Sequence, residues 1–497
     1  MMATAPRRVR WYTYAAYGSM DVLGAGSMAV ISTWVLFFYT TFCGLSVAEA
    51  GWIFVIARIL DAFASPLIGY VSDNLGETWI GRKFGRRRFF ILAAIPLLPS
   101  FAFMWVAGNG FWYYLVTYVF FELVYAAVII PYETLAAEMA TDYKTKAKFA
   151  GARILCGQLS AVAAAFLPKL LIESLGKDSP NTYFYMGAIF ASLFMLAALM
   201  LFLFSWERAR PPELRTAVKR PGLGATFVQL YRNLFSTLRI RAFRLHLGMY
   251  LGGYLSQDIY NAAFTYFVIF ALLGTTSTVA NLVGVTYAVQ LIAVGLAILF
   301  ALRLSPALAY RIAAASFAAA VVIFIAMYWT GYTAVSALFW IPVVFAGLGR
   351  GALNYIPWAT YNYMADVDEI VTGKRREGAF AGVMTFVRKL TQAAAVMIVT
   401  QMMQASGFVS KATTQSPEAI AAIVAVLGIG TLVMLAFGVL VSLRFRLDPH
   451  THAVLMDEIE RFRADPATEP SSPENKRVVE DLSGWSYDRL WGRNPVA

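Results

Sequence analysis

Several charged residues lie inside stretches that are otherwise apolar, and their spacing indicates which of them can act together. Arg58 and Asp61 are three residues apart, and Ser65 follows Asp61 by four, so a helix would place all three on one face. A carboxylate beside a guanidinium in apolar surroundings is suited to taking up and releasing a proton. The group is a candidate for cation coupling or for the hinge of a rocking motion, although a structural ion pair that only neutralises itself has the same spacing.

Other apolar stretches also carry charges, and each charge needs a reason to be there. A charged side chain within a bilayer costs from about 2.5 kcal/mol upwards, so it usually faces a cavity or a partner and marks a functional site. Arg388 and Lys389 are adjacent and would point about 100° apart on a helix, so we expect only one of them to face a central cavity. Further charges in such stretches include Asp21, Glu122, Glu133, Arg153, Asp258 and Arg350, and Glu138 lies close to the inner interface, where a surface or gate residue is expected.

These carboxylates have alternative roles. Asp61 is the first candidate for a proton carrier, and Asp21, Glu133 and Asp258 follow it. Glu122 is a further coupling candidate, although Glu122 and Glu133 can also cap or pair with a neighbouring helix. Three aromatic residues, Tyr355, Trp358 and Tyr361, recur at every third position around Pro357. They suit a platform for the apolar face of a sugar ring, and helix packing explains them as well.

The elements that must position these residues are apolar runs. The chain is 59% hydrophobic and 14% charged over 497 residues, whereas soluble domains are about 25% charged. A bilayer-spanning helix needs about 20 apolar residues. We therefore expect an all-α membrane protein with twelve transmembrane helices near residues 15–41, 47–72, 89–108, 111–138, 149–173, 182–205, 244–272, 279–302, 309–330, 333–363, 378–405 and 417–443. The first run is much longer than a signal-peptide core and is expected to be retained.

The net charge of +12 reflects topology. Basic residues cluster after the second, fourth and tenth runs, and the other loops hold little beyond Lys177 and Lys411. The positive-inside rule places these basic loops and both termini in the cytoplasm. The charge therefore indicates an inner-membrane protein among lipids rather than a nucleic-acid partner. The clusters are Arg82, Lys83, Arg86, Arg87 and Arg88; Lys144, Lys146 and Lys148; and Lys374, Arg375 and Arg376.

A polar stretch divides the chain, and a weak repeat supports the division. Residues 1–206 and 242–445 each hold six runs, separated by a cytoplasmic loop at 207–241. Pro131 precedes a Met139-Ala140 pair, and Pro357 precedes a similar Met364-Ala365 pair. Such duplicated halves are typical of major facilitator transporters. In the cytoplasmic tail, 446–497, residues 450–465 predict an amphipathic helix on the inner membrane face, and 466–476 predict a flexible segment.

The sequence argues against other protein classes. Cys43 and Cys156 form no disulfide or metal pattern. The three histidines, His246, His450 and His452, join no Cys/His cluster, and there is no Asp-rich loop of a metal-dependent transferase. We therefore expect no cofactor, no metal and no enzymatic activity. The duplication favours a carrier over a channel or sensor, and carriers of this fold commonly act as monomers.

At this point the residues show a family resemblance. Asp21, the Phe38-Tyr39-Thr40 and Gly44-Leu45-Ser46 segments, and residues 57–62 followed by Ser65-Pro66 and Gly69 resemble the glycoside-pentoside-hexuronide:cation symporters. The resemblance continues through residues 130–132, Arg153, the 366–378 loop and Lys389, and it covers roughly residues 10–445. The Gly69, Asp73, Gly85, Arg86 and Arg87 pattern resembles the general major facilitator loop motif, lengthened by an insertion.

The resemblance implies alternating access around a central sugar site. It implies that Asp21 and Arg153 bind sugar hydroxyls and that Lys389 bridges the halves near a cation site. Glu133, Tyr355 and Trp358 are the further substrate-binding candidates. Asp73, Arg86 and Arg87 are the candidates for conformational gating.

One departure from the family pattern concerns the cation. The family's sodium site has two carboxylates one turn apart in the second span, an amide between them, and an Asp before the proline of the fourth span. Here only Asp61 is kept, and the other positions are Ala64, Ser65 and Ile129. We therefore expect weak or absent sodium coupling, leaving proton coupling or facilitated diffusion. The same loss of polar ligands, with many aromatics, leaves a lysophospholipid or other amphiphile carrier as the alternative.

Overall fold

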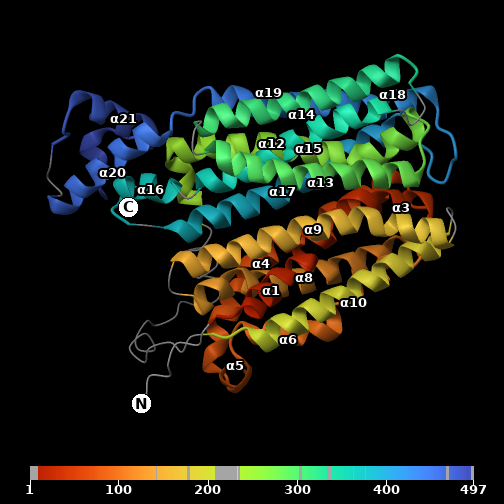
Figure 1. Cartoon of the computed structure of the whole chain (residues 1–497), viewed down its shortest axis with the longest axis horizontal. Helices are drawn as coiled ribbons and strands as arrows, with labels where there is room; N and C mark the ends of the chain where they lie inside the picture. The colour runs from red at the N-terminus through yellow and green to blue at the C-terminus, as the bar shows by residue number, and fades with distance from the viewer. Residues whose placement is uncertain are drawn as a thin grey trace. The chain divides into compact units, whose positions relative to one another are not determined.

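The computed structural model describes residues 9–140, 143–175, 179–207, 232, 235–301, 305–332, 337–361, 363–374, 376–465 and 469–493 (Figure 1). Within these residues the secondary structure is helical and contains no β-strand. This confirms the predicted all-α class. The predicted central loop, 207–241, lies mostly outside the described residues.

Nine helical segments of the described residues are long and apolar enough to cross a membrane. The first, Trp11–Thr41, contains two π-helical turns, η1 (Val22–Gly26) and η2 (Ile31–Val35), between α1 (Trp11–Ser19), α2 (Ser27–Val30) and α3 (Leu36–Thr41). The last combines α18 (Pro417–Ala425), η9 (Val426–Gly430) and α19 (Thr431–Ser442). The others lie in α4 (Val47–Asn74), α8 (Phe111–Met139), α9 (Tyr143–Leu175), α10 (Pro180–Phe204), α13 (Thr276–Ala301), α14 (Pro306–Trp329) and α17 (Glu377–Ala405).

The three other predicted spans are helical as well. The third is divided into α6 (Arg88–Ala94), η4 (Ile95–Leu97) and α7 (Ser100–Phe103), because Pro96 and Pro99 each lack the N–H that a continuous helix requires. The seventh is α12 (Arg241–Tyr266) with η7 (Phe267–Ala271), and the tenth is α15 (Trp340–Tyr361). The helices therefore occupy all twelve predicted positions.

The chain packs as two compact units. The first unit holds residues 1–218, 261–288 and 396–423, and the second holds 219–260, 289–395 and 424–497. In the first, α4 packs along α8, and α1 packs along α9 and α10; in the second, α14 packs along α15 and α19. The predicted division into six-helix halves remains a prediction.

The C-terminal tail packs on protein. In the second unit, α20 (Pro449–Ala464) and α21 (Pro473–Ser483) contact α16 (Met364–Thr372). The apolar residues Leu455, Ile459 and Phe462 of α20 are fully buried. The helix was predicted correctly, but its position against the membrane was wrong, because protein already covers this apolar face. Residues 473–476 are helical rather than flexible, and 466–468 lie outside the described residues.

Polar contacts fix the tail on α16. His452 Nε2 lies 2.9 Å from Asp366 Oδ2, Arg463 Nε donates to Glu369 Oε1 over 2.8 Å, and the Trp491 backbone N–H donates to Ile370 O over 2.8 Å. Within the tail, Glu458 accepts from the Tyr487 hydroxyl over 2.7 Å. Burial raises the pKa of Glu458, but hydrogen bonds from Ser471 and Tyr487 outweigh it, so the net pKa lies below the usual value.

Helices of the first unit also meet at a glycine. A Cβ at Gly51 of α4 would lie 2.2 Å from Thr400 Oγ1 and 2.8 Å from Thr400 Cβ on α17. Thr400 is fully buried, and its hydroxyl donates to Val396 O over 2.9 Å. The threonine therefore has little room to move aside.

We predict that Gly51→Ala lowers the thermal unfolding midpoint, by the equivalent of about 1–3 kcal/mol, because overpacking forces a helix to shift. Gly295→Ala on α13 is the matched control, since nothing lies within 4 Å of its added Cβ. The control is expected to be neutral or up to about 1 kcal/mol more stable, from helix propensity. Equal midpoints for the two variants would contradict the close packing at Gly51.

Candidate functional site

Three charged residues of the first unit meet in one cluster, which we call the Asp21 cluster: Asp21, Glu133 and Arg153. Arg153 Nη2 donates to Glu133 Oε1 over 2.8 Å, and its Nε lies 3.5 Å from Asp21 Oδ1. The Arg153 guanidinium carbon lies 5.4 Å from the centre of the Tyr132 ring. The three charges come from the first span, α8 and α9, so the fold joins residues more than a hundred positions apart.

Two glycines leave room for the Asp21 carboxylate. A Cβ at Gly24 would lie 2.4 Å from Asp21 Oδ1, and a Cβ at Gly157 of α9 would lie 2.2 Å from Asp21 Oδ2. Asp21 also immediately precedes the π-helical turn η1, a distortion that often occurs at functional sites. Any side chain at either glycine would displace the carboxylate.

The Asp21 cluster is partly open to solvent. The Arg153 side chain is 34% exposed and that of Glu133 is 49% exposed, although both residues lie within apolar membrane-spanning segments. Since an exposed charge inside a span faces water rather than lipid, these groups are accessible to a polar solute. A guanidinium that donates and carboxylates that accept form charge-assisted bonds to neighbouring hydroxyls of a sugar.

A second charged cluster of the first unit is buried. Arg58 Nη2 lies 3.2 Å from Glu122 Oε1, and its Nη1 lies 3.9 Å from Asp61 Oδ2. The Ser65 hydroxyl donates to Asp61 Oδ1 over 3.0 Å, and the spacing had predicted that both residues lie on one helix face. Arg58, Asp61 and Glu122 are each at most 3% exposed. The sequence indicated the Arg58–Asp61 neighbourhood, but the shorter contact of Arg58 is with Glu122, which is 64 positions away.

The other predicted substrate-binding and coupling residues lie in the second unit. Asp258 of α12 is paired with Arg388 of α17, and the Trp358 indole N–H donates to the Tyr254 hydroxyl over 3.1 Å. Lys389 is half-buried, and so is Tyr355, one turn before Trp358. Sequence reasoning named Asp258 and Trp358 but did not select Arg388 or Tyr254.

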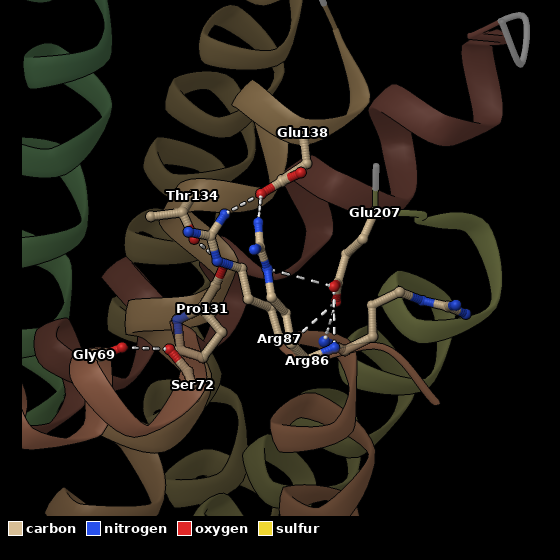
Figure 2. A network of polar contacts seen from close by, with 9 residues as sticks. Gly69, Ser72, Arg86, Arg87, Pro131, Thr134, Glu138 and Glu207 are labelled. Carbon is tan, nitrogen blue, oxygen red and sulfur yellow. Dashed lines mark hydrogen bonds and ion pairs between the residues drawn. The ribbon is translucent and has the colours of Figure 1, made fainter. Parts of the chain in front are cut away.

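The predicted gating residues Arg86 and Arg87 lie in a polar network of the first unit (Figure 2). Arg87 Nη1 donates to Glu138 Oε1 over 2.7 Å, and Arg86 also donates to that oxygen. Figure 2 shows both arginines reaching Glu138 at the end of α8. The Asp73 side chain is outside the described part of the structure.

Glu207 completes this network, and the sequence analysis missed it. Its carboxylate accepts from the backbone N–H groups of Arg86, Arg87 and Arg88, over 3.0, 2.9 and 2.8 Å. Figure 2 shows this carboxylate directed at the start of α6. A negative charge at a helix N-terminus is stabilising. The only signal in the sequence was an acidic residue directly after the sixth predicted span.

We predict that Glu207→Ala destabilises the protein by about 1–3 kcal/mol, because three backbone donors lose their acceptor. Thermal unfolding in detergent measures the effect. Glu173→Ala is the matched control: its side chain is 51% exposed and lies 3.8 Å from Lys169, and an exposed pair of this kind contributes about 0–1 kcal/mol. If the two variants unfold at the same temperature, Glu207 does not anchor α6.

Comparison with known proteins connects this arrangement to a family. The family described as MFS/sugar transport protein matches residues 16–449. The glucuronide carrier protein homolog of Escherichia coli is 25% identical and the alignment covers 83% of this chain and 88% of that relative. The uncharacterized symporter sll1374 of Synechocystis is 24% identical, over 81% of this chain and 87% of that relative.

A solved structure shows the same fold. The bacterial homolog of the human lysosomal transporter Spinster superposes with a TM-score of 0.60 at 16% identity, covering 89% of this chain and all of that one. The predicted major facilitator fold and the predicted absence of an enzymatic role are thereby confirmed at the level of the family. The chain belongs to the MFS/sugar transport protein family and is a multi-pass membrane transporter.

Proposed function

We propose that this protein is a secondary transporter that carries a sugar or glycoside across the inner membrane by alternating access, coupled to H⁺ rather than Na⁺. The observation that carries the proposal is the Asp21 cluster, where the Arg153 guanidinium and the Glu133 carboxylate are open to a polar solute inside the membrane-spanning part and the buried Asp21 carboxylate lies beside Arg153. Hydroxyl groups are the ligands that such a set binds. Both similar relatives are described as carriers or symporters, which supports the same role here.

The coupling residue in this proposal is Asp61. It is fully buried, next to Arg58 and hydrogen-bonded to Ser65. A single proton needs one carboxylate, whereas Na⁺ needs several oxygen ligands. The three positions where the resembling family supplies further ligands are Ala64, Ser65 and Ile129, of which only Ser65 has a side-chain oxygen. Glu122 already lies closer to the Arg58 guanidinium than Asp61 does, and it would keep that charge paired when Asp61 is protonated.

The proposed gating part is the network of Arg86, Arg87, Glu138 and Glu207. It is built from charged pairs that can separate and re-form as helices move. Asp73 belongs to the same predicted motif. The topology that goes with this role places the network and both termini in the cytoplasm, as the basic loops predict.

We predict that Gly157→Ala reduces sugar uptake at least tenfold, close to the effect of Asp21→Asn, because the added methyl displaces the Asp21 carboxylate. Uptake into proteoliposomes is the measurement. Gly151→Ala lies on the same helix with nothing within 4 Å of its Cβ, so it controls for the general effect of the substitution. Normal uptake by Gly157→Ala would contradict the proposal that the Asp21 carboxylate binds the sugar.

Ion coupling is tested in the same proteoliposomes with imposed gradients. We predict that the wild type accumulates a sugar under an inward H⁺ gradient and that an Na⁺ gradient adds nothing. Asp61→Asn should abolish pH-driven accumulation but keep sugar exchange at equilibrium. Asp457→Asn, an exposed carboxylate of α20, is the control and should behave as wild type.

Two outcomes would contradict the proposal. Accumulation that requires Na⁺ would overturn the argument from the missing ligands. The second test offers lysophosphatidylcholine beside a panel of monosaccharides, disaccharides, glycosides and uronates. If only lysophosphatidylcholine is taken up, the substrate is an amphiphile and not a sugar.

A further inference from the structure

A second polar cluster in the second unit has the features of a binding subsite. Arg388 donates from both terminal nitrogens to the Asp258 carboxylate, with Nη2 2.8 Å from Oδ1. The two residues are 130 positions apart, on α12 and α17. This bidentate pair has no net charge.

Aromatic rings surround the pair. The Arg388 guanidinium carbon lies 4.8 Å from the centre of the Tyr254 ring. Tyr254 accepts from the Trp358 indole N–H over 3.1 Å, and Trp358 stands edge-on to Tyr250 at 6.0 Å between ring centres. The hydrogen bond fixes the indole, so the ring is held in one orientation beside the charged pair.

The exposure of these residues sets them apart from a closed structural pair. Arg388 keeps 21% of its side chain exposed, and Trp358 is 39% exposed, whereas Asp258 is only 7% exposed. Arg388 lies eight residues inside the apolar segment Phe380–Ala405. An exposed guanidinium at that depth faces water rather than lipid, and a solute in that water can reach it.

We propose that Arg388, Asp258, Tyr254 and Trp358 form a sugar-binding subsite in the second unit, selective for an uncharged sugar ring with neighbouring hydroxyls. The inference rests on the proposed sugar transport. The indole covers the apolar face of the ring, while the free edge of Arg388 donates to one hydroxyl and Asp258 accepts from the next. Asp258 therefore acts as a positioning and binding group beside Arg388 rather than as the proton carrier.

The charge balance excludes an acidic sugar as the preferred substrate. A uronate carboxylate at the remaining edge of Arg388 would lie beside the Asp258 carboxylate, which already balances the charge of the guanidinium, so the two carboxylates would repel each other. In the first unit, the partly exposed Arg153 already has two carboxylate neighbours, Asp21 and Glu133. Neutral glycosides are bound without breaking either arrangement.

A double-mutant cycle separates this role from a structural one. Arg388→Gln and Asp258→Asn each remove one charge of a largely buried ion pair, so both single variants should unfold at a lower temperature. The double variant R388Q/D258N removes both charges and should regain most of the thermal midpoint. We expect that the double variant, although stably folded, still binds sugar poorly, with the KM for a neutral glycoside raised at least tenfold.

Two further variants complete the experiment. R376Q/D368N removes a bidentate pair of the same type, with distances of 2.9 and 2.6 Å, next to α16; it should leave KM unchanged. Trp358→Leu keeps both charges and should raise KM without changing the thermal midpoint. In a competition assay on the wild-type protein, the concentration of a methyl glycoside that halves sugar uptake should be at least tenfold lower than that of the matching uronate.

The outcomes are distinct. A wild-type KM in both R388Q/D258N and Trp358→Leu overturns the subsite, while sugar uptake itself stands. Stronger inhibition by the uronate overturns the selectivity for uncharged rings. Absence of any sugar uptake by the wild type overturns the proposed function, and the subsite with it.

Discussion

The cost of placing a charge in an apolar segment determines how this structure is organised. Among the described spans, Arg58 is paired with Glu122, Arg153 with Glu133 and Arg388 with Asp258. In each case the partners come from different helices, so an ion pair fixes which helices lie together. The polar chemistry of the protein and its helix packing therefore depend on the same contacts, and a change in one pair is expected to affect both.

Glycine allows close approaches at three other points of the first unit. Gly157 brings α9 against the Asp21 carboxylate, and Gly51 lets α4 contact Thr400. Gly85 has a φ of +92°, and a Cβ there would lie 2.8 Å from Glu207 Oε1, so this position both turns the chain and admits the capping carboxylate. A methyl group at any of these positions would separate groups whose interaction depends on short distance.

The sequence predicted what depends on neighbouring residues and missed what depends on distant ones. The apolar runs predicted the spans, and the i, i+4 spacing predicted that Asp61 and Ser65 share a helix face, where the structure has a hydrogen bond between them. Glu122 as the closer partner of Arg58, Arg388 as the partner of Asp258, and Glu207 as the cap of α6 involve separations of 64, 130 and about 120 positions. The tail was misplaced because an amphipathic face has the same pattern whether protein or lipid covers it.

The charged clusters contain the same residue types, but their side chains differ in solvent exposure. Arg58, Asp61 and Glu122 are closed off, so a solute cannot reach them, while a proton needs only a brief opening. Arg153 and Arg388 each keep a fifth or more of the side chain exposed, within segments that otherwise face lipid or protein. A transporter that couples two species needs one site that admits the ion alone and another that admits the solute. Under the proposed function, the buried carboxylate of Asp61 would meet the first requirement, and each arginine cluster, taken by itself, would meet the second.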